Sequence, residues 1–191
     1  NDMVGFGWKD LYLVKLDGEG RILWEQRFGG RGDDSGASVE ETAEGGFVVV
    51  GKTTSFDSSN IVEKIYLVRT DANGKLLWEK HFSSQGRQYG HDMGLADDGT
   101  IIIAGYGYDA EKKQNAYYLS RVDGSGNLLW QRHFGKASYP DFRNGIAIAS
   151  DGGFVVAGDD GGYVQLSKLD RNGVMVWERS FTWGTARSVS R

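Results

Sequence analysis

A hairpin pattern that recurs four times constrains the fold of this chain more than any other feature of its sequence. Each copy begins with an alternating apolar strand that runs into an Asp, continues through a turn ending in Gly, and finishes with a second strand that carries a Trp. The copies are residues 11–28, 65–82, 117–134 and 163–181. An Asp side chain can accept hydrogen bonds from the turn's own amides, and Gly adopts the positive φ that closes the loop. We therefore expect four β-hairpins built on one plan.

The spacing of the hairpins predicts larger repeat units. Their Trp residues are 54, 52 and 47 residues apart, close to the length of a four-stranded propeller blade. Two further strand candidates lie between successive hairpins: a segment with small residues, starting at 37, 91 and 144, and an apolar segment, starting at 46, 100 and 153. Small residues suit an inner strand at a crowded axis, and we expect the Trp of each hairpin to pack between neighbouring blades. The predicted fold class is therefore all-β, a β-propeller of four four-stranded blades.

The two ends of the chain carry complementary parts of one blade. Residues 3–7 match a second strand, and residues 185–191 resemble the start of an inner strand. Pairing these N- and C-terminal strands closes the ring and removes exposed sheet edges. This matching favours a monomer; the alternative is a dimer of two four-blade halves that forms an eight-bladed ring. We predict a single propeller domain over residues 1–191, with repeat units at 1–28 plus 185–191, 37–83, 91–134 and 144–181.

Composition supports this fold class and narrows the range of partners. The chain has 29 Gly, one Pro and 13% aromatic residues, which is typical of many short strands joined by tight turns. Its net charge of −4 is spread along the sequence, so no basic face indicates a nucleic acid partner. No apolar run is long enough to cross a bilayer. The absence of Cys excludes disulfides and thiol chemistry.

The sequence contains no recognisable metal, cofactor or catalytic motif. Each Asp-x-x-Gly turn supplies at most two carboxylates, whereas Ca²⁺ takes six to eight oxygen ligands. No Ser/His/Asp set can be assembled from spacing, and no phosphate-binding Gly loop precedes a helix. We therefore predict no cofactor, no metal and no catalytic residue.

The Asp-x-x-Gly turn followed by two hydrophobic residues and Trp, together with the Gly-Gly-Phe-Val-Val-x-Gly strand, resembles a known repeat family. The pattern is similar to the bacterial and archaeal β-propeller repeats grouped as seven-bladed (SBBP-type) and quinoprotein-like repeats, and it covers essentially all 191 residues. The resemblance implies an extracytoplasmic location: periplasmic, secreted or on the cell surface. Quinoprotein dehydrogenases of this type bind pyrroloquinoline quinone over calcium and carry a vicinal disulfide, from which this Cys-free chain departs. Non-enzymatic members act as assembly scaffolds.

Loops on one face of the predicted propeller differ most among the four copies. In a four-stranded blade, the loops from outer to next inner strand and from second to third strand emerge on the same face. Here these loops vary in length and contain aromatic and Arg residues, which dominate binding hot spots. The alternative is that the aromatic residues fold under their own loops and the Arg residues pair with Asp to tie blades together. The candidate ligand-binding residues are Trp8, Arg31, Arg87, Tyr89, His91, Tyr139, Arg143 and Trp183.

These features favour a non-enzymatic binding or scaffolding propeller that engages a protein or a glycan through its loop-rich face. One alternative is a propeller enzyme, a lyase or glycoside hydrolase, in which Asp33, Asp92 and Asp141 converge near the central axis. Another is a purely architectural module of a larger surface protein.

Overall fold

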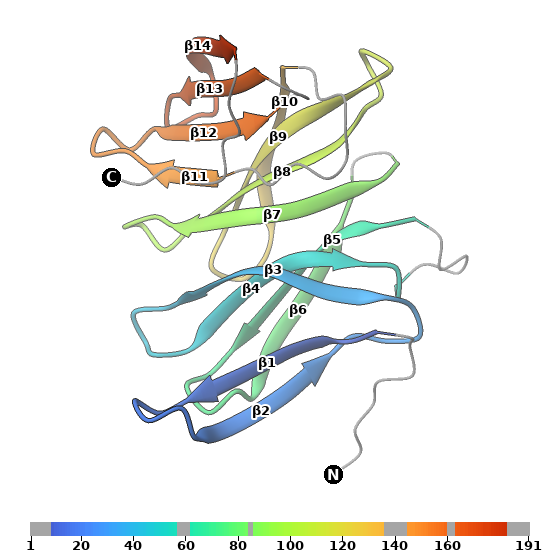
Figure 1. Cartoon of the computed structure of the whole chain (residues 1–191), viewed down its shortest axis with the longest axis vertical. Coiled ribbons are helices and arrows are strands. Elements are labelled where there is room, and N and C mark those ends of the chain that lie inside the picture. Colours follow the sequence, from blue (N-terminus) through green and yellow to red (C-terminus); the bar gives the residue numbers. More distant parts are fainter. Residues whose placement is uncertain (1–8, 57–61, 84–85, 136–144, 160–162, 183–191) are drawn as a thin grey trace. The chain divides into compact units, whose positions relative to one another are not determined.

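The computed structural model describes residues 9–56, 62–83, 86–135, 145–159 and 163–182. All regular structure in these segments is β, and its 14 strands form four antiparallel sheets whose order along the chain is that of the predicted blades (Figure 1). Three sheets have four strands and the first has two. The all-β prediction is confirmed, and the sheets are consistent with a four-bladed propeller. Residues 3–7 and 185–191 lie outside the described segments, so ring closure stays a prediction.

The chain divides into two compact units, Asn1–Tyr89 and Gly90–Arg191, which are described separately below. The prediction of one domain over residues 1–191 is not tested by this division.

The first unit contains the two-stranded sheet and one complete four-stranded sheet. The strands are β1 (Leu11–Leu16), β2 (Ile22–Phe28), β3 (Asp34–Glu41), β4 (Phe47–Thr53), β5 (Lys64–Thr70) and β6 (Leu76–Phe82). β1 pairs with β2, and β3 to β6 are neighbours in sequence order. Residues of β1, β2, β4 and β5 share a core, where Leu11 and Phe28 of the first hairpin pack with Val49, Tyr66 and Val68 of the next sheet.

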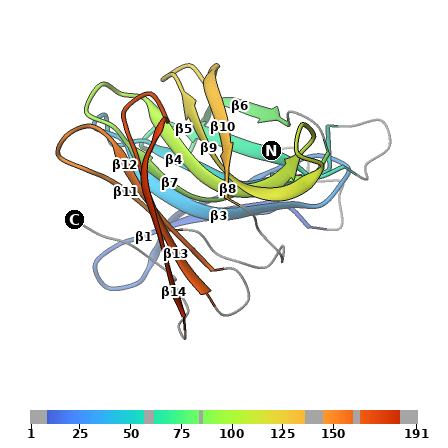
Figure 2. The ribbon, with the colours of Figure 1, turned by 90° about the horizontal axis from the view of Figure 1, so that it is seen from above.

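The second unit repeats this plan with two four-stranded sheets. The strands are β7 (Gln88–Leu95), which begins in the last residues of the first unit, β8 (Ile101–Asp109), β9 (Gln114–Val122), β10 (Leu128–Phe134), β11 (Gly145–Ile148), β12 (Phe154–Asp159), β13 (Tyr163–Leu169) and β14 (Met175–Thr182). The sheets are β7 to β10 and β11 to β14, each in sequence order. The strands twist along their length (Figure 2). Ile103, Tyr118 and Leu119 are fully buried in the middle strands.

The hairpin turns have the predicted chemistry in all four copies. In the first, Oδ1 of Asp17 accepts hydrogen bonds from the amides of Glu19 and Arg21, each at 2.9 Å, and Gly20 has a φ of +80°. Asp71, Asp123 and Asp170 accept the equivalent pairs of bonds in the other three turns. All four hairpins also carry a register shift in the strand pair next to the turn. Local turn chemistry therefore sets the strand register.

The hairpin Trp packs against the next blade within each unit, as the sequence predicts. In the first unit, Trp24 meets Phe47 edge to face, with ring centroids 5.6 Å apart, and its Nε1 donates to the carbonyl of Ala72 at 3.2 Å. In the second unit, the ring centroids of Trp130 and Phe154 are 6.1 Å apart. Each Trp therefore joins one sheet to the sheet that follows it.

Candidate functional site

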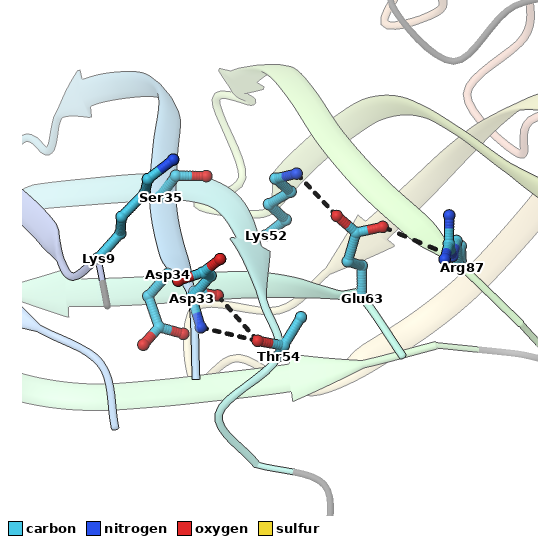
Figure 3. Close-up of a pocket in the computed structure, with 8 residues that line it drawn as sticks. All are labelled: Lys9, Asp33, Asp34, Ser35, Lys52, Thr54, Glu63 and Arg87. Atoms are coloured by element: carbon cyan, nitrogen blue, oxygen red, sulfur yellow. Dashed lines mark hydrogen bonds and ion pairs between the residues drawn. The ribbon is translucent and has the colours of Figure 1, made fainter. Parts of the chain in front are cut away.

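A polar pocket lies in the first unit, at the end of the sheet where β3 begins and β4 ends (Figure 3). Its volume is about 310 Å³. The residues that line it come from the segment before β1, the start of β3 and the residue before it, the end of β4 and the residue after it, and the residues just before β5 and β7. They are Lys9, Asp33, Asp34, Ser35, Lys52, Thr54, Glu63 and Arg87. Three cationic and three carboxylate side chains therefore share one small cavity.

Asp34 holds one wall of the pocket in place. It is only 2% exposed, and its carboxylate accepts hydrogen bonds from the hydroxyl of Thr53, from the hydroxyl of Ser55 at 2.5 Å and from the amide of Gly30 at 2.9 Å. A buried carboxylate requires such donors because desolvation penalises its charge. The Ser55 oxygen in turn accepts the amide of Gly32 at 2.9 Å. This network fixes the β2–β3 loop against the loop that follows β4.

Glu63 organises the opposite wall. Its carboxylate lies between two cations in Figure 3: Nζ of Lys52 is 2.8 Å from Oε1, and Nε of Arg87 is 3.8 Å from Oε2. The phenol of Tyr89 donates a hydrogen bond to Oε2, and the Lys52 ammonium lies 5.1 Å from the centre of the Tyr89 ring. The four side chains form one connected cluster, which links the end of β4 to the residue before β5 and to residues 87–89.

The electrostatics of this cluster keep Glu63 ionised. Burial by itself raises the pKa of Glu63, but the hydrogen bonds from Lys52 and Tyr89 and the charges of Lys52 and Arg87 outweigh it, so the pKa lies below its ordinary value. Burial and the hydrogen bond to Glu63 raise the pKa of Tyr89 to about 12. Both groups therefore keep one protonation state near neutral pH, which is unsuited to general acid–base catalysis.

Other charges at the pocket remain available to a bound molecule. Lys9 and Asp33 are exposed, and neither side chain forms an ion pair with another residue in the described segments. The Asp33 backbone is nevertheless fixed, because its amide donates to the hydroxyl of Thr54 at 2.7 Å. Arg87 is 67% exposed on the other side. The pocket thus offers positive and negative groups on a rigid frame, and the described residues hold no cluster suited to a metal ion.

Of the candidate binding residues that the structure describes, two lie at or next to the pocket and two do not. Arg87 lines the pocket, and Tyr89 supports it through Glu63. Arg31 is exposed in the β2–β3 loop but is not part of the lining, and His91 belongs to the second unit, partly buried in β7. Trp8, Tyr139, Arg143 and Trp183 lie outside the described residues. Their role in binding stays a prediction.

Two aromatic residues of the predicted loop face are packed inward. Phe56 stacks on His81, with ring centroids 4.6 Å apart, and packs against the core of the first unit. Tyr106 is 4% exposed in β8. Phe56 therefore packs inward, as the alternative of aromatic residues folded under their own loops describes, whereas Tyr106 is a strand residue rather than a loop residue. One carboxylate of the alternative enzyme reading also has a structural bond: Oδ2 of Asp92 accepts the amide of Ile146 at 2.9 Å, which joins β7 to β11.

Sequence reasoning missed most of the pocket. Lys9, Asp34, Lys52 and Glu63 are charged residues at strand ends, where solvated side chains are common, so their residue types alone carried no signal. A sharper signal was available in the comparison of repeats. Lys52 aligns with Tyr106 and Asp159, and Lys9 aligns with Glu63, so the charge at each of these blade positions changes from copy to copy.

Comparison with known proteins agrees with this architecture. The family described as outer membrane protein assembly factor BamB matches residues 9–190. The chain belongs to this family. Membership confirms the quinoprotein-like propeller character that the repeats predicted; the finer likeness to SBBP-type repeats stays a prediction.

A solved structure supports the fold assignment. A protein of unknown function from Bacteroides caccae, determined at 1.35 Å, is similar with a TM-score of 0.61 and 18% sequence identity. The match covers 97% of this chain and 59% of that chain, so this member of the BamB family spans about three fifths of the solved protein. No match was found among curated proteins. None of the described residues forms a helix able to cross a membrane.

Proposed function

We propose that this chain is a binding or scaffolding propeller that engages a protein through its loop face, and that the pocket in the first unit is part of the contact surface. The proposal rests on a difference among the charged residues of the pocket: some are fixed by hydrogen bonds and others are exposed. Asp34 and Glu63 are held by several hydrogen bonds each, whereas Lys9, Asp33 and Arg87 are exposed around them. A rigid frame with outward charges suits recognition, because charge complementarity selects and orients a partner.

The lining favours a protein segment over a glycan. None of its eight residues is aromatic, so it lacks the flat apolar surface against which a sugar ring could pack. Paired positive and negative groups instead match the charged side chains and backbone of an extended peptide. The family description, an assembly factor for outer membrane proteins, supports a protein partner and an extracytoplasmic location.

An array of peptides that tile outer membrane proteins tests the proposal, with a glycan array run in parallel. Wild-type protein is compared with two charge reversals at the pocket, Lys9→Glu and Asp33→Lys. We expect binding to acidic peptides to fall about tenfold in Lys9→Glu and binding to basic peptides to fall similarly in Asp33→Lys. Both losses are expected to shrink as salt concentration rises.

Lys75→Glu is the matched control, because Lys75 is exposed in the turn between β5 and β6, at the other end of the same sheet. Equal losses in Lys75→Glu and Lys9→Glu would show that net charge, rather than the pocket, controls binding. Glycan binding without peptide binding would refute a protein partner. Adding Trp183→Ala, Tyr139→Ala and Arg143→Ala to the array tests the remaining candidates of the loop face.

A further inference from the structure

Two of the four repeated hairpin turns place an Asn directly before the turn Gly. These are Asn73–Gly74 in the first unit and Asn172–Gly173 in the second, whereas the equivalent residue is Glu or Ser in the other two turns. In such a pair the backbone nitrogen of Gly can attack the side-chain carbonyl carbon of Asn, because Gly has no Cβ to obstruct the approach. Asn is a thermolabile residue for this reason. Both turns are therefore candidate sites of spontaneous deamidation.

The reaction consumes only water and would damage the turn. The Gly nitrogen forms a bond to Cγ of Asn, and the side-chain nitrogen leaves as ammonia, taking the proton that the Gly nitrogen loses. Water then opens the resulting succinimide ring at one of its two carbonyls, which gives Asp or isoaspartate. Asp adds a negative charge two residues from the carboxylate of Asp71 or Asp170, and isoaspartate lengthens the backbone within the turn. Either product would weaken the turn on which a Trp packs.

In the first unit, the Gly nitrogen is bonded and the residues on both sides of Asn73 are fixed. The amide of Gly74 donates to the carbonyl of Asp71 at 3.1 Å, a bond that must break before its nitrogen can attack. Nε1 of Trp24 donates to the carbonyl of Ala72 at 3.2 Å, and the Trp24 ring lies so close to Gly74 that a Cβ there would be 2.8 Å from Cε3. Asn73 itself is exposed, so water reaches it. The restraint therefore acts on the backbone rather than on the access of water.

The second unit holds its Asn-Gly pair in the same way, with a different donor on one side. The amide of Gly173 donates to the carbonyl of Asp170 at 3.0 Å, and the Trp130 ring lies 2.8 Å from a Cβ placed at Gly173. On the other side of the Asn, Nη1 of Arg121 donates to the carbonyl of Arg171 at 3.0 Å. The Asn is exposed here too. In both units, the preceding sheet therefore fixes the backbone on each side of an exposed Asn.

We propose that Asn73 and Asn172 are deamidation sites that the Trp contacts between sheets keep unreactive, and that each reacts only after its own Trp has left the turn. Local opening of a folded protein exposes such groups without global unfolding. When opening and closing are fast, the rate of modification follows the population of the open form. Deamidation at each Asn therefore reports the opening of one Trp contact, and isoaspartate in the turn prevents that contact from re-forming as before.

Mass spectrometry of peptides from protein incubated at neutral pH measures both sites in the same molecule. We expect Trp24→Ala to accelerate deamidation of Asn73 about tenfold or more and to leave Asn172 unchanged, because it removes the aromatic contact and the hydrogen bond of one turn. Trp130→Ala should have the opposite effect. Trp24→Phe keeps a ring but cannot donate to the carbonyl of Ala72, so an intermediate acceleration is expected even if Trp24→Ala does not fold. Wild-type chain in urea supplies the unprotected rates, and circular dichroism checks the fold of each variant.

Leu67→Ala is the matched control, because Leu67 is fully buried in β5 and belongs neither to the turn nor to the core shared with the first hairpin. It destabilises the first unit but should change the deamidation rate of Asn73 less than Trp24→Ala does. Equal acceleration in the two variants would show that unfolding of the unit, rather than loss of the Trp contact, exposes Asn73. Deamidation of folded wild-type protein at the rate found in urea would show that the turns are not protected, and unchanged rates in both Trp variants would show that the turn's own hydrogen bonds suffice. Each of these results would overturn the proposal.

Discussion

Replacing Gly74 with Ala tests whether the Trp contact between blades stabilises the first unit. The substitution has two costs. Gly74 has a φ of +79°, a conformation that costs a residue with a Cβ about 1–2 kcal/mol. The new Cβ would also lie 2.8–3.0 Å from three atoms of the Trp24 ring, and relieving such overpacking costs about 1–3 kcal/mol more. We expect Gly74→Ala to lower the free energy of unfolding by about 2–5 kcal/mol.

Gly20→Ala separates the two costs. Gly20 occupies the same turn position with a φ of +80°, but no described atom lies within 4 Å of the added Cβ. Its expected loss is the backbone cost alone, about 1–2 kcal/mol. The difference between the two variants then reports the displacement of Trp24.

Urea denaturation followed by far-UV circular dichroism and by Trp fluorescence measures both losses. A shift in native-state fluorescence is expected for Gly74→Ala, because Trp24 must move, and not for Gly20→Ala. Equal losses in the two variants, within about 0.5 kcal/mol, would contradict the argument that the ring presses on this turn.

Three further predictions concern the pocket. Asp34→Ala leaves the hydroxyls of Thr53 and Ser55 without their acceptor and should cost about 3 kcal/mol in urea denaturation; a loss below about 1 kcal/mol would show that the network is dispensable. The pKa of Glu63 is lower in the folded protein than its ordinary value of 4.5, so ionised Glu63 contributes its full stabilisation above pH 4.5. This contribution is lost as the pH falls through the native pKa. Because Glu63→Gln removes the titrating group, the free energy of unfolding of this variant should depend less on pH in that acidic range. Glu63→Gln should also bring the pKa of Tyr89 down from about 12, measured by ultraviolet titration with Tyr89→Phe as the reference; an unchanged pKa would mean that burial alone raises it.

The candidate site was predicted in part. Arg87 and Tyr89 were selected because aromatic and Arg residues gathered in variable loops, and both belong to the charged cluster around Glu63. The partners of that cluster could not be predicted from residue type. Lys52 and Glu63 are 11 residues apart along the chain, and only the pairing of β4 with β5 brings their charges to 2.8 Å.

The repeated hairpin shows what the sequence by itself determined. Each Asp bonds amides two and four residues further on, and each turn Gly supplies its own positive φ, so four equivalent hairpins follow from interactions within a few residues. The alternating strands and the Trp contact between blades could be predicted for a related reason, because the same pattern recurs in all four copies.

Only the tertiary structure decided which repeated positions are covered and which are not. Trp130 and Trp177 are equivalent in sequence, yet one lies on a Gly turn and the other is exposed. Lys9 and Glu63 occupy one repeat position with opposite charges, and they line the same pocket. Burial and charge pairing depend on neighbours in space, and a repeat pattern describes a blade without stating what lies beside it.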